Sequence, residues 1–320
     1  MKQFLPILAC VSLLALDVSA DDPTSDVPLA HRFYQTIDRY EARGWFAAPA
    51  SGARPYTRRR AVRFLLEILR RADAGASLSQ TERGVLDRHW AEFSAELGRL
   101  GYPPSPSPRQ GVVGRLFGGD NLFAWQDSVA SVAIDPLFRQ RLLLVRGEGR
   151  AEETVSQTYV GGIVRGTYYN RFGFRVRHFE AREWSTRPRI SRQDIIARPI
   201  EVVQFKGKAV DFREANFQLV WATPWFDLDI GKHSLDWGPG RSGNLLLTDN
   251  ASPFGLVRFR ASYGRVNLVH VVGFLRARAG LIDSSRTRID NGHLRTFLRS
   301  KYMSAHRVEI RLSGRLSIGL

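Results

Sequence analysis

The sequence predicts a mainly β protein: an antiparallel outer-membrane β-barrel, incomplete in this chain, that follows a small α-helical bundle. Three observations lead to this prediction. The chain begins with an export signal, its apolar residues have helical spacing up to about residue 100, and from about residue 128 they stand at every second position. With 320 residues, the chain is long enough for one large domain or for two.

The first 20 residues have the pattern of a cleaved secretory signal peptide. Lys2 supplies a positive charge, Phe4–Leu16 is almost entirely apolar, and small residues at positions 18–20 precede Asp21. This apolar run is shorter than the roughly 20 residues that a membrane-spanning helix needs. The single cysteine, Cys10, lies in the signal, so the mature chain is expected to contain no disulfide and no thiol nucleophile.

The charge of the chain restricts its partners. Lys and Arg number 47 against 31 Asp and Glu, a net charge of +16, and arginine makes up nearly all of the cationic side. An exported protein meets anionic glycans, lipopolysaccharide and membrane surfaces rather than nucleic acid, and the guanidinium group binds carboxylates and phosphates in a bidentate way. A solvated basic surface without a specific partner is the alternative.

Residues 21–100 are predicted to form a helical periplasmic region. Gly44 ends a helix over His31–Arg43, Thr57 caps a second, and Ser79 with Glu82 has the spacing of a capping box for a third. The apolar stripes of these helices are expected to pack together as a three-helix bundle.

A linker over residues 101–111 is predicted next, because four prolines in "GYPPSPSPRQG" exclude a helix or a central strand. The linker suggests that the helical region is separable from the strands and dispensable for membrane insertion. Residues 112–320 then form the partial barrel.

Apolar and polar residues alternate through this last part. The clearest apolar sets are Phe172, Phe174 and Val176; Phe217, Leu219 and Trp221; Phe226, Leu228 and Ile230; Val257, Phe259 and Ala261; and Val308, Ile310 and Leu312. A soluble sandwich turns such a face inward, whereas an outer-membrane barrel turns it to lipid and keeps charges in its lumen. Charges on the polar face, the export signal and aromatic residues at strand ends (Tyr168, Tyr169, Trp221, Trp225 and Tyr263) favour the barrel.

The sequence ends in "RLSGRLSIGL", within an apparent strand. An open barrel would leave backbone groups unpaired in lipid. The expectation is therefore that the sequence is the first part of a longer barrel.

The stretch "GKHSLDWGPGRSGNLLLTDNASPFGLVRF" (Gly231–Phe259) resembles a segment of the capsule assembly Wzi family of outer-membrane proteins. "VPLAHRFYQTIDRYEARGWF" (Val27–Phe46) and "RPYTRRRAVRFLLEI" (Arg54–Ile68) are similar to the helical N-terminal region of that family. The resemblance implies a large barrel in the outer membrane of a Gram-negative bacterium, with its helical bundle on the periplasmic side. It also implies a surface lectin that holds anionic capsular polysaccharide or exopolysaccharide at the cell.

Two sets of residues are candidates for polysaccharide binding. The polar faces of the strands carry Arg175, Arg177, Arg258 and Arg260, and the loop of the family-like stretch carries Trp237, Arg241, Asn244, Asp249 and Asn250. Guanidinium groups would bind acidic sugars, and tryptophan would stack on a sugar ring. The alternative is structural: the arginines pair with Asp227, Asp229 or Glu309, and the loop side chains bond to their own backbone.

The sequence predicts no catalytic residue, no metal site and no cofactor. His233 and Ser234 are neighbours on a strand and point to opposite faces, which argues against a nucleophile and its base. Two other functions remain open: a soluble periplasmic glycan-binding β-sandwich and an outer-membrane lipid-modifying hydrolase.

Overall fold

The computed structural model describes residues 25–29, 31–46, 52–103, 122–147, 150–169, 171–186, 202–223, 225–238, 240, 244, 247–248, 252–276, 288–290, 293–295, 299–313 and 316–320. The predicted signal peptide and most of the predicted linker lie outside the described residues. So do three candidate binding residues: Arg241, Asp249 and Asn250.

Short helices come first in the chain. They are α1 (Phe33–Ala42), α2 (Arg58–Asp73), α3 (Gln80–Glu92) and α4 (Ser94–Arg99). The hydroxyl of Thr57 caps α2 by accepting from the backbone N–H of Arg60, and Ser79 with Glu82 forms the predicted capping box of α3. The helices enclose a core of their own, which includes Phe33, Ile37, Tyr40, Leu65, Ile68, Leu86, Phe93 and Leu97.

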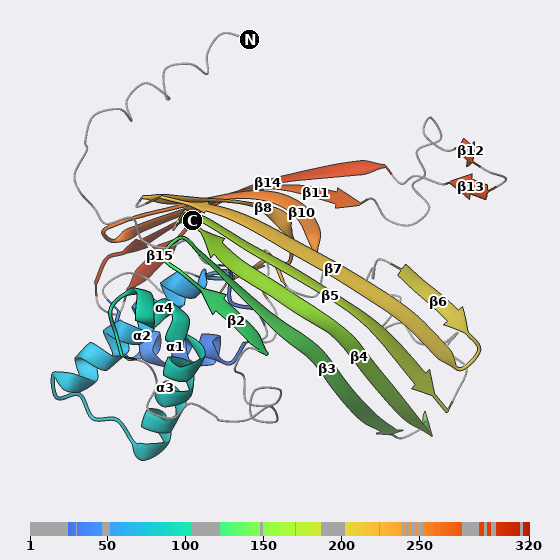
Figure 1. Cartoon of the computed structure of the whole chain (residues 1–320), viewed down its shortest axis with the longest axis horizontal. Coiled ribbons are helices and arrows are strands. Elements are labelled where there is room, and N and C mark those ends of the chain that lie inside the picture. The colour runs from blue at the N-terminus through green and yellow to red at the C-terminus, as the bar shows by residue number, and fades with distance from the viewer. Residues whose placement is uncertain are drawn as a thin grey trace, which may run out of the picture.

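A large antiparallel sheet follows, as predicted. Its strands are β2 (Phe123–Gln126), β3 (Ala130–Gly147), β4 (Arg150–Tyr168), β5 (Phe172–Ser185), β6 (Val202–Lys206), β7 (Ala209–Ala222), β8 (Phe226–His233), β10 (Phe254–Tyr263), β11 (Val266–Arg276), β14 (Ser300–Arg311) and β15 (Ser317–Gly319). Their order is β15-β14-β11-β10-β8-β7-β5-β4-β3-β2, and β6 pairs with β7 beside this path. Within the described residues the sheet curves but does not close (Figure 1).

Two small strand pairs lie apart from the large sheet. One consists of β1 (Ala53–Arg54) and β9 (Asp236–Trp237), and the other of β12 (Arg288–Asp290) and β13 (His293–Arg295). The first pair joins the helical region to the segment that follows β8.

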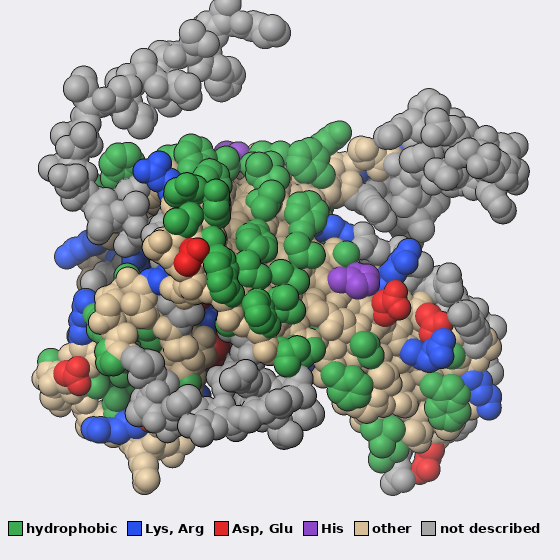
Figure 2. Space-filling view, in the orientation of Figure 1, with side chains coloured by type: hydrophobic (Ala, Val, Ile, Leu, Met, Phe, Trp, Pro, Cys, Tyr) green, Lys and Arg blue, Asp and Glu red, His purple; other side chains and the backbone are tan. Residues whose placement is uncertain are grey.

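The two faces of the sheet differ in chemistry. On β7, Phe217, Leu219 and Trp221 are exposed, whereas Asn216, Gln218 and Val220, which alternate with them, are buried. The register places Leu219 opposite Phe174 of β5, so the apolar rows continue from strand to strand. Figure 2 shows hydrophobic side chains gathered over the middle of the sheet. We call this apolar side the outer face and the polar side the inner face.

The helices pack against the inner face, below one end of the sheet (Figure 1). Arg99 donates to the hydroxyl of Thr167 on β4 at 2.9 Å, and Arg311 of β14 donates to Glu41 of α1 at 3.0 Å. The backbone N–H of Gly52 donates to Glu309 of β14 at 2.7 Å. These contacts pack the helical region against the strands, and its dispensability for membrane insertion stays a prediction.

Short turns mark the end of the sheet where the helices lie. Only three residues separate β4 from β5 and β7 from β8, and two separate β10 from β11. At the opposite end, 16 residues stand between β5 and β6 and 23 between β11 and β14, the latter including β12 and β13, while two-residue turns join β3 to β4 and β6 to β7. In outer-membrane barrels the short turns are periplasmic and the longer loops extracellular.

Candidate functional site

A buried polar cluster joins the N-terminal segment to the inner face of the sheet. One nitrogen of Arg258, Nη2, donates to Oδ2 of Asp26 and to Oδ2 of Asp229, the latter at 2.5 Å. Arg260 donates through Nη1 to Oδ1 of Asp26 at 3.1 Å. Asp26 thus receives hydrogen bonds from two arginines that stand 232 and 234 residues further along the chain.

The strand register brings the charged groups of the sheet together. Asp229 of β8 lies directly opposite Arg258 of β10, and Asp227 lies opposite Arg260. Since side chains two residues apart share one face of a strand, both pairs point inward. Nη2 of Arg260 is 3.6 Å from Oδ2 of Asp227. The pairing of these arginines with Asp227 and Asp229, expected as the structural alternative, is confirmed.

The backbone around Asp26 fixes its position. The N–H of Asp26 donates to the side chain of Gln218 on β7 at 3.0 Å, and the N–H of Val27 donates to the carbonyl of Tyr56 at 2.8 Å. Burial opposes ionisation of the Asp26 carboxyl group, but the neighbouring Arg258 and Arg260 guanidinium groups hold its pKa below the usual range. The carboxylate therefore stays charged and binds the arginines.

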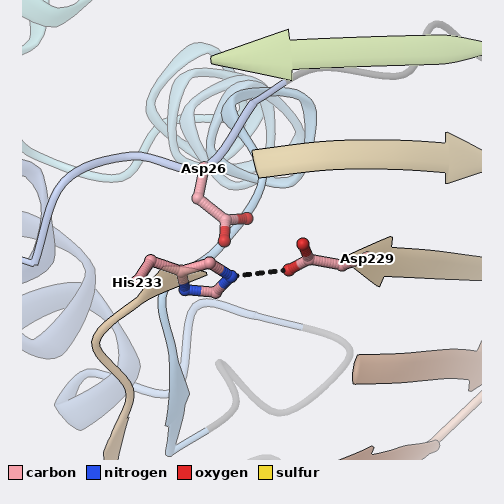
Figure 3. A group of neighbouring side chains, drawn as sticks. All are labelled: Asp26, Asp229 and His233. Carbon is pink, nitrogen blue, oxygen red and sulfur yellow. Dashed lines mark hydrogen bonds and ion pairs between the residues drawn. The ribbon is translucent and has the colours of Figure 1, made fainter. Parts of the chain in front are cut away.

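Asp26, Asp229 and His233 form a group that resembles a set of metal ligands. One ligand atom of each lies within 4.8 Å of the others, and Figure 3 shows their side chains pointing toward one another. Arg258, however, already donates to both carboxylates, and His233 Nε2 is 3.1 Å from Asp229. A divalent cation would have to displace a guanidinium group with which both carboxylates are paired, so these residues fit an ion-pair network and not a metal centre.

The loop after β8 folds inward and holds the N-terminal segment. Trp237 pairs with Ala53 in the β9–β1 ladder, and the N–H of Gly238 donates to the carbonyl of Gly52 at 2.7 Å. The Trp237 side chain is 2 % exposed and belongs to a core cluster with Leu256. Its packing leaves no free ring face for stacking on a sugar in this arrangement.

Asn244 is a brace within the same loop. Its side chain accepts from the N–H of Gly240 at 2.8 Å and donates to Asp236 at 2.6 Å. The bond to Gly240 is of the kind that the structural alternative expected, a loop side chain bonded to loop backbone, and the bond to Asp236 joins two side chains.

Two further candidate arginines lie on β5. Arg175 donates to the carbonyl of Asp26 at 3.1 Å and so belongs to the buried cluster. Arg177 stands over the ring of Phe179 at 5.0 Å, and its Nη1 is 3.8 Å from Glu214. Arg177 keeps 35 % of its side-chain surface exposed, which makes it more accessible than Arg258 or Arg260.

Sequence reasoning missed Asp26 and Gln218 as members of the cluster. Asp26 stands in a short extended segment before Pro28, where an aspartate resembles an ordinary turn residue. The sequence indicated Asp26 only indirectly, because buried arginines on the inner face of a sheet need carboxylate partners.

Fold and site together define a class: β-sheet proteins with an apolar outer face and a charged inner face braced by N-terminal helices. A family model described as capsule assembly protein Wzi matches residues 137–320, which is more than half of the 320-residue chain. The chain therefore belongs to the capsule assembly Wzi family, as its resemblance indicated. A search of curated proteins and a search of solved structures found no match.

Family membership gives the chain a role in capsule assembly at the cell envelope and suggests capsular polysaccharide as its partner. In the described part of the chain, no helix combines the length and apolar character needed to cross a membrane.

Proposed function

We propose that this protein is an outer-membrane lectin-like protein that binds capsular polysaccharide or exopolysaccharide and helps to attach it at the surface of a Gram-negative cell. The observation that carries the proposal is the family match over residues 137–320. It supports capsule assembly directly, and the binding step is our inference from the chemistry of the two faces.

The outer face supports contact with outer-membrane lipid and lipopolysaccharide. Phe217, Leu219 and Ile230 are about half exposed and lie next to one another on β7 and β8. At the short-turn end, Trp221, Trp225 and Tyr263 are exposed, where an interfacial aromatic girdle is expected. A soluble glycan-binding sandwich would cover such a face, and its inner polar face would not be the one packed on helices.

The inner face supports an anionic glycan as partner. Of the candidates described, Arg177 and Arg260 are the better placed for direct contact, because Arg177 is accessible and Arg260 has nitrogens without hydrogen-bond acceptors in the described residues. Arg175, Trp237, Asn244 and Arg258 act by holding the arrangement in place. Arg241, Asp249 and Asn250 stay candidates from the sequence.

Hydrolase chemistry has little support. The Wzi family is one of capsule assembly and not a known enzyme family. Nε2 of His233 is directed to Asp229. Nδ1 of His233 is 3.4 Å from an oxygen of Ser234, but this oxygen is the backbone carbonyl and not the side-chain hydroxyl. A serine nucleophile needs its base within hydrogen-bond distance of the hydroxyl.

Binding of purified capsular polysaccharide to the detergent-solubilised protein tests the proposal. We expect Arg177→Glu to weaken binding about tenfold or more, since it reverses one charge contact, and added salt to weaken wild-type binding. Arg88→Glu, which places the same charge change on the exposed surface of α3, is the control and should bind normally. No binding by wild-type protein that has folded would refute the lectin-like role.

A further inference from the structure

A cavity of about 330 Å³ lies between the first turns of α2 and the short turns of the sheet. Asp26 and Arg258 do not line it, but Arg260 does, and Arg260 also donates to Asp26. Arg59, Arg60 and Arg63 line it from α2, and Thr223, Trp225 and Gly264 line it from the turns after β7 and β10.

Positive charge dominates this cavity. Four arginines line it (Arg59, Arg60, Arg63 and Arg260), against two carboxylates, Glu67 and Asp227. The first turn of α2 has no acidic residue, although the N-terminal end of a helix favours negative charge. Arg59 and Arg60 stand in this first turn and add positive charge to the positive end of the helix dipole. The cavity therefore combines the helix dipole and the guanidinium groups in attracting an anion.

Arg260 gives an independent indication of a missing acceptor. Its side chain is 8 % exposed, and Nη1 donates to Asp26 and to the carbonyl of Pro55. Nε and Nη2 are buried and make no hydrogen bond to any described residue, because Asp227 is too distant from Nη2 at 3.6 Å. Buried N–H groups without an acceptor are costly, so an oxygen ligand beside them would stabilise the arrangement.

Arg60 stands close enough to Arg260 for the two cations to oppose each other. Burial is the main cause that lowers the pKa of Arg60, and the like charge of Arg260 also lowers it, while the charges of Tyr56, Glu309 and Asp227 act in the opposite direction. An anion between them would relieve this repulsion.

Aromatic side chains complete the lining. Tyr56 and Phe226 are part of the cavity wall, and Trp225 at its edge is half exposed. Arginine forks beside aromatic rings suit a ring-shaped ligand that carries a carboxylate, because the rings cover the apolar face of a sugar while the forks bind the charge.

We propose that this cavity binds an acidic monosaccharide unit of a glycan through its carboxylate, with Arg60, Arg63 and Arg260 as ligands and Trp225 against the sugar ring. The proposal rests on the proposed function, since it assumes an anionic polysaccharide partner, and it assigns a second site at the helical end of the sheet.

The test measures binding of a short glucuronic acid oligosaccharide to the full chain in detergent by calorimetry. Arg60→Gln with Arg63→Gln should weaken binding about tenfold or more, since two charge-assisted contacts are lost. Arg70→Gln with Arg71→Gln removes the same charge from the exposed far end of α2 and should bind like wild type. An uncharged glucose oligosaccharide should not bind.

The outcomes separate this proposal from the proposed function. If both double variants lose the same binding affinity, or if neither loses any, the cavity is not the binding site. In either case, binding of the oligosaccharide by the wild-type protein still supports the lectin-like role. Binding of inorganic phosphate without binding of the oligosaccharide overturns the saccharide as ligand. If the glutamine variant does not fold, Arg60→Lys with Arg63→Lys decides: loss of the planar forks should weaken binding about threefold or more, and unchanged binding overturns the proposal.

Discussion

Asp26 holds the N-terminal segment on the sheet through two buried arginines, Arg258 and Arg260. Removing one member of a buried ion pair leaves the other charge without compensation, which costs more than the pair itself contributes. At the residue scale, Asp26 is therefore the position where a single change should loosen the contact between helices and strands.

We expect Asp26→Asn to lower the free energy of unfolding by about 3 kcal/mol, because Arg258 and Arg260 lose a carboxylate they share. Denaturant unfolding in detergent, followed by circular dichroism, measures it. Asp73→Asn on the exposed end of α2 is the control, with a change within about 0.5 kcal/mol. Equal stability of the two variants would show that the cluster does not hold the segment.

Because His89 is buried, the stability of the helical region should depend on pH. Burial, opposed in part by Glu92, lowers its pKa from 6.5 to about 4, and Thr36 Oγ1 lies 3.0 Å from its Nε2. The unfolded chain binds the proton more tightly, so stability is fully present above about pH 6.5 and falls as the pH drops toward 4. The loss is on the order of 3 kcal/mol.

His89→Gln should remove this part of the pH dependence, since glutamine does not titrate. Thermal unfolding of wild type and variant between pH 4 and pH 7 measures the difference. The exposed His178 of β5 serves as control in His178→Gln. If the His89 variant retains the full wild-type slope, other groups cause it.

At the scale of elements, the inward loop after β8 depends on one glycine. Gly238 has a φ of 141°, and a Cβ there would lie 2.2 Å from Oδ1 of Asn244. Its N–H also continues the β1–β9 contact by donating to Gly52. An alanine would be strained in its backbone and would push away the side chain that braces the loop.

Gly238→Ala should therefore lower the free energy of unfolding by about 1–3 kcal/mol. Gly84→Ala within α3, where a Cβ would contact nothing within 4 Å, should be neutral or stabilising by up to about 1 kcal/mol. The unfolding midpoints of the two variants test this. A neutral Gly238→Ala would mean that the loop does not need this conformation.

The features that depend on neighbouring residues could be predicted from the sequence better than the contacts between residues far apart in the chain. The caps at Thr57 and Ser79 and the alternation on β5, β7 and β10 follow from neighbouring residues, so they could be predicted from the sequence. The same alternation predicted that Arg258 and Arg260 meet aspartates across the sheet. The contact with Asp26 could not be predicted, because it joins residues 232 positions apart and depends on which face the helices cover. The inward fold of the loop has the same long-range cause.

At the scale of the whole molecule, the proposed membrane position makes the outer face sensitive to charge. Leu219, 58 % exposed, lies between Phe174 and Ile230 in the register. On a lipid-facing surface, Leu219→Arg should destabilise the inserted protein by up to about 2–4 kcal/mol. On a water-facing surface, the same change should be neutral or improve solubility.

Gln140→Arg is the matched control. Gln140 is exposed on the same face, in the row that contains Thr158, Arg182 and Asp211, where charge is already present. The heat-dependent gel shift of membrane fractions measures insertion. We expect the Leu219 variant to lose inserted protein while the Gln140 variant keeps it, and equal amounts of both would contradict a lipid-facing outer face.

The most direct test of the proposed role compares polysaccharide on the cell with polysaccharide in the medium after the gene for this protein is deleted from its host. We expect the cell-associated fraction to fall and the released fraction to rise while total synthesis stays unchanged, and the unmodified gene to restore attachment. An unchanged ratio of attached to released polysaccharide in the deletion strain would contradict a role in holding capsule at the surface.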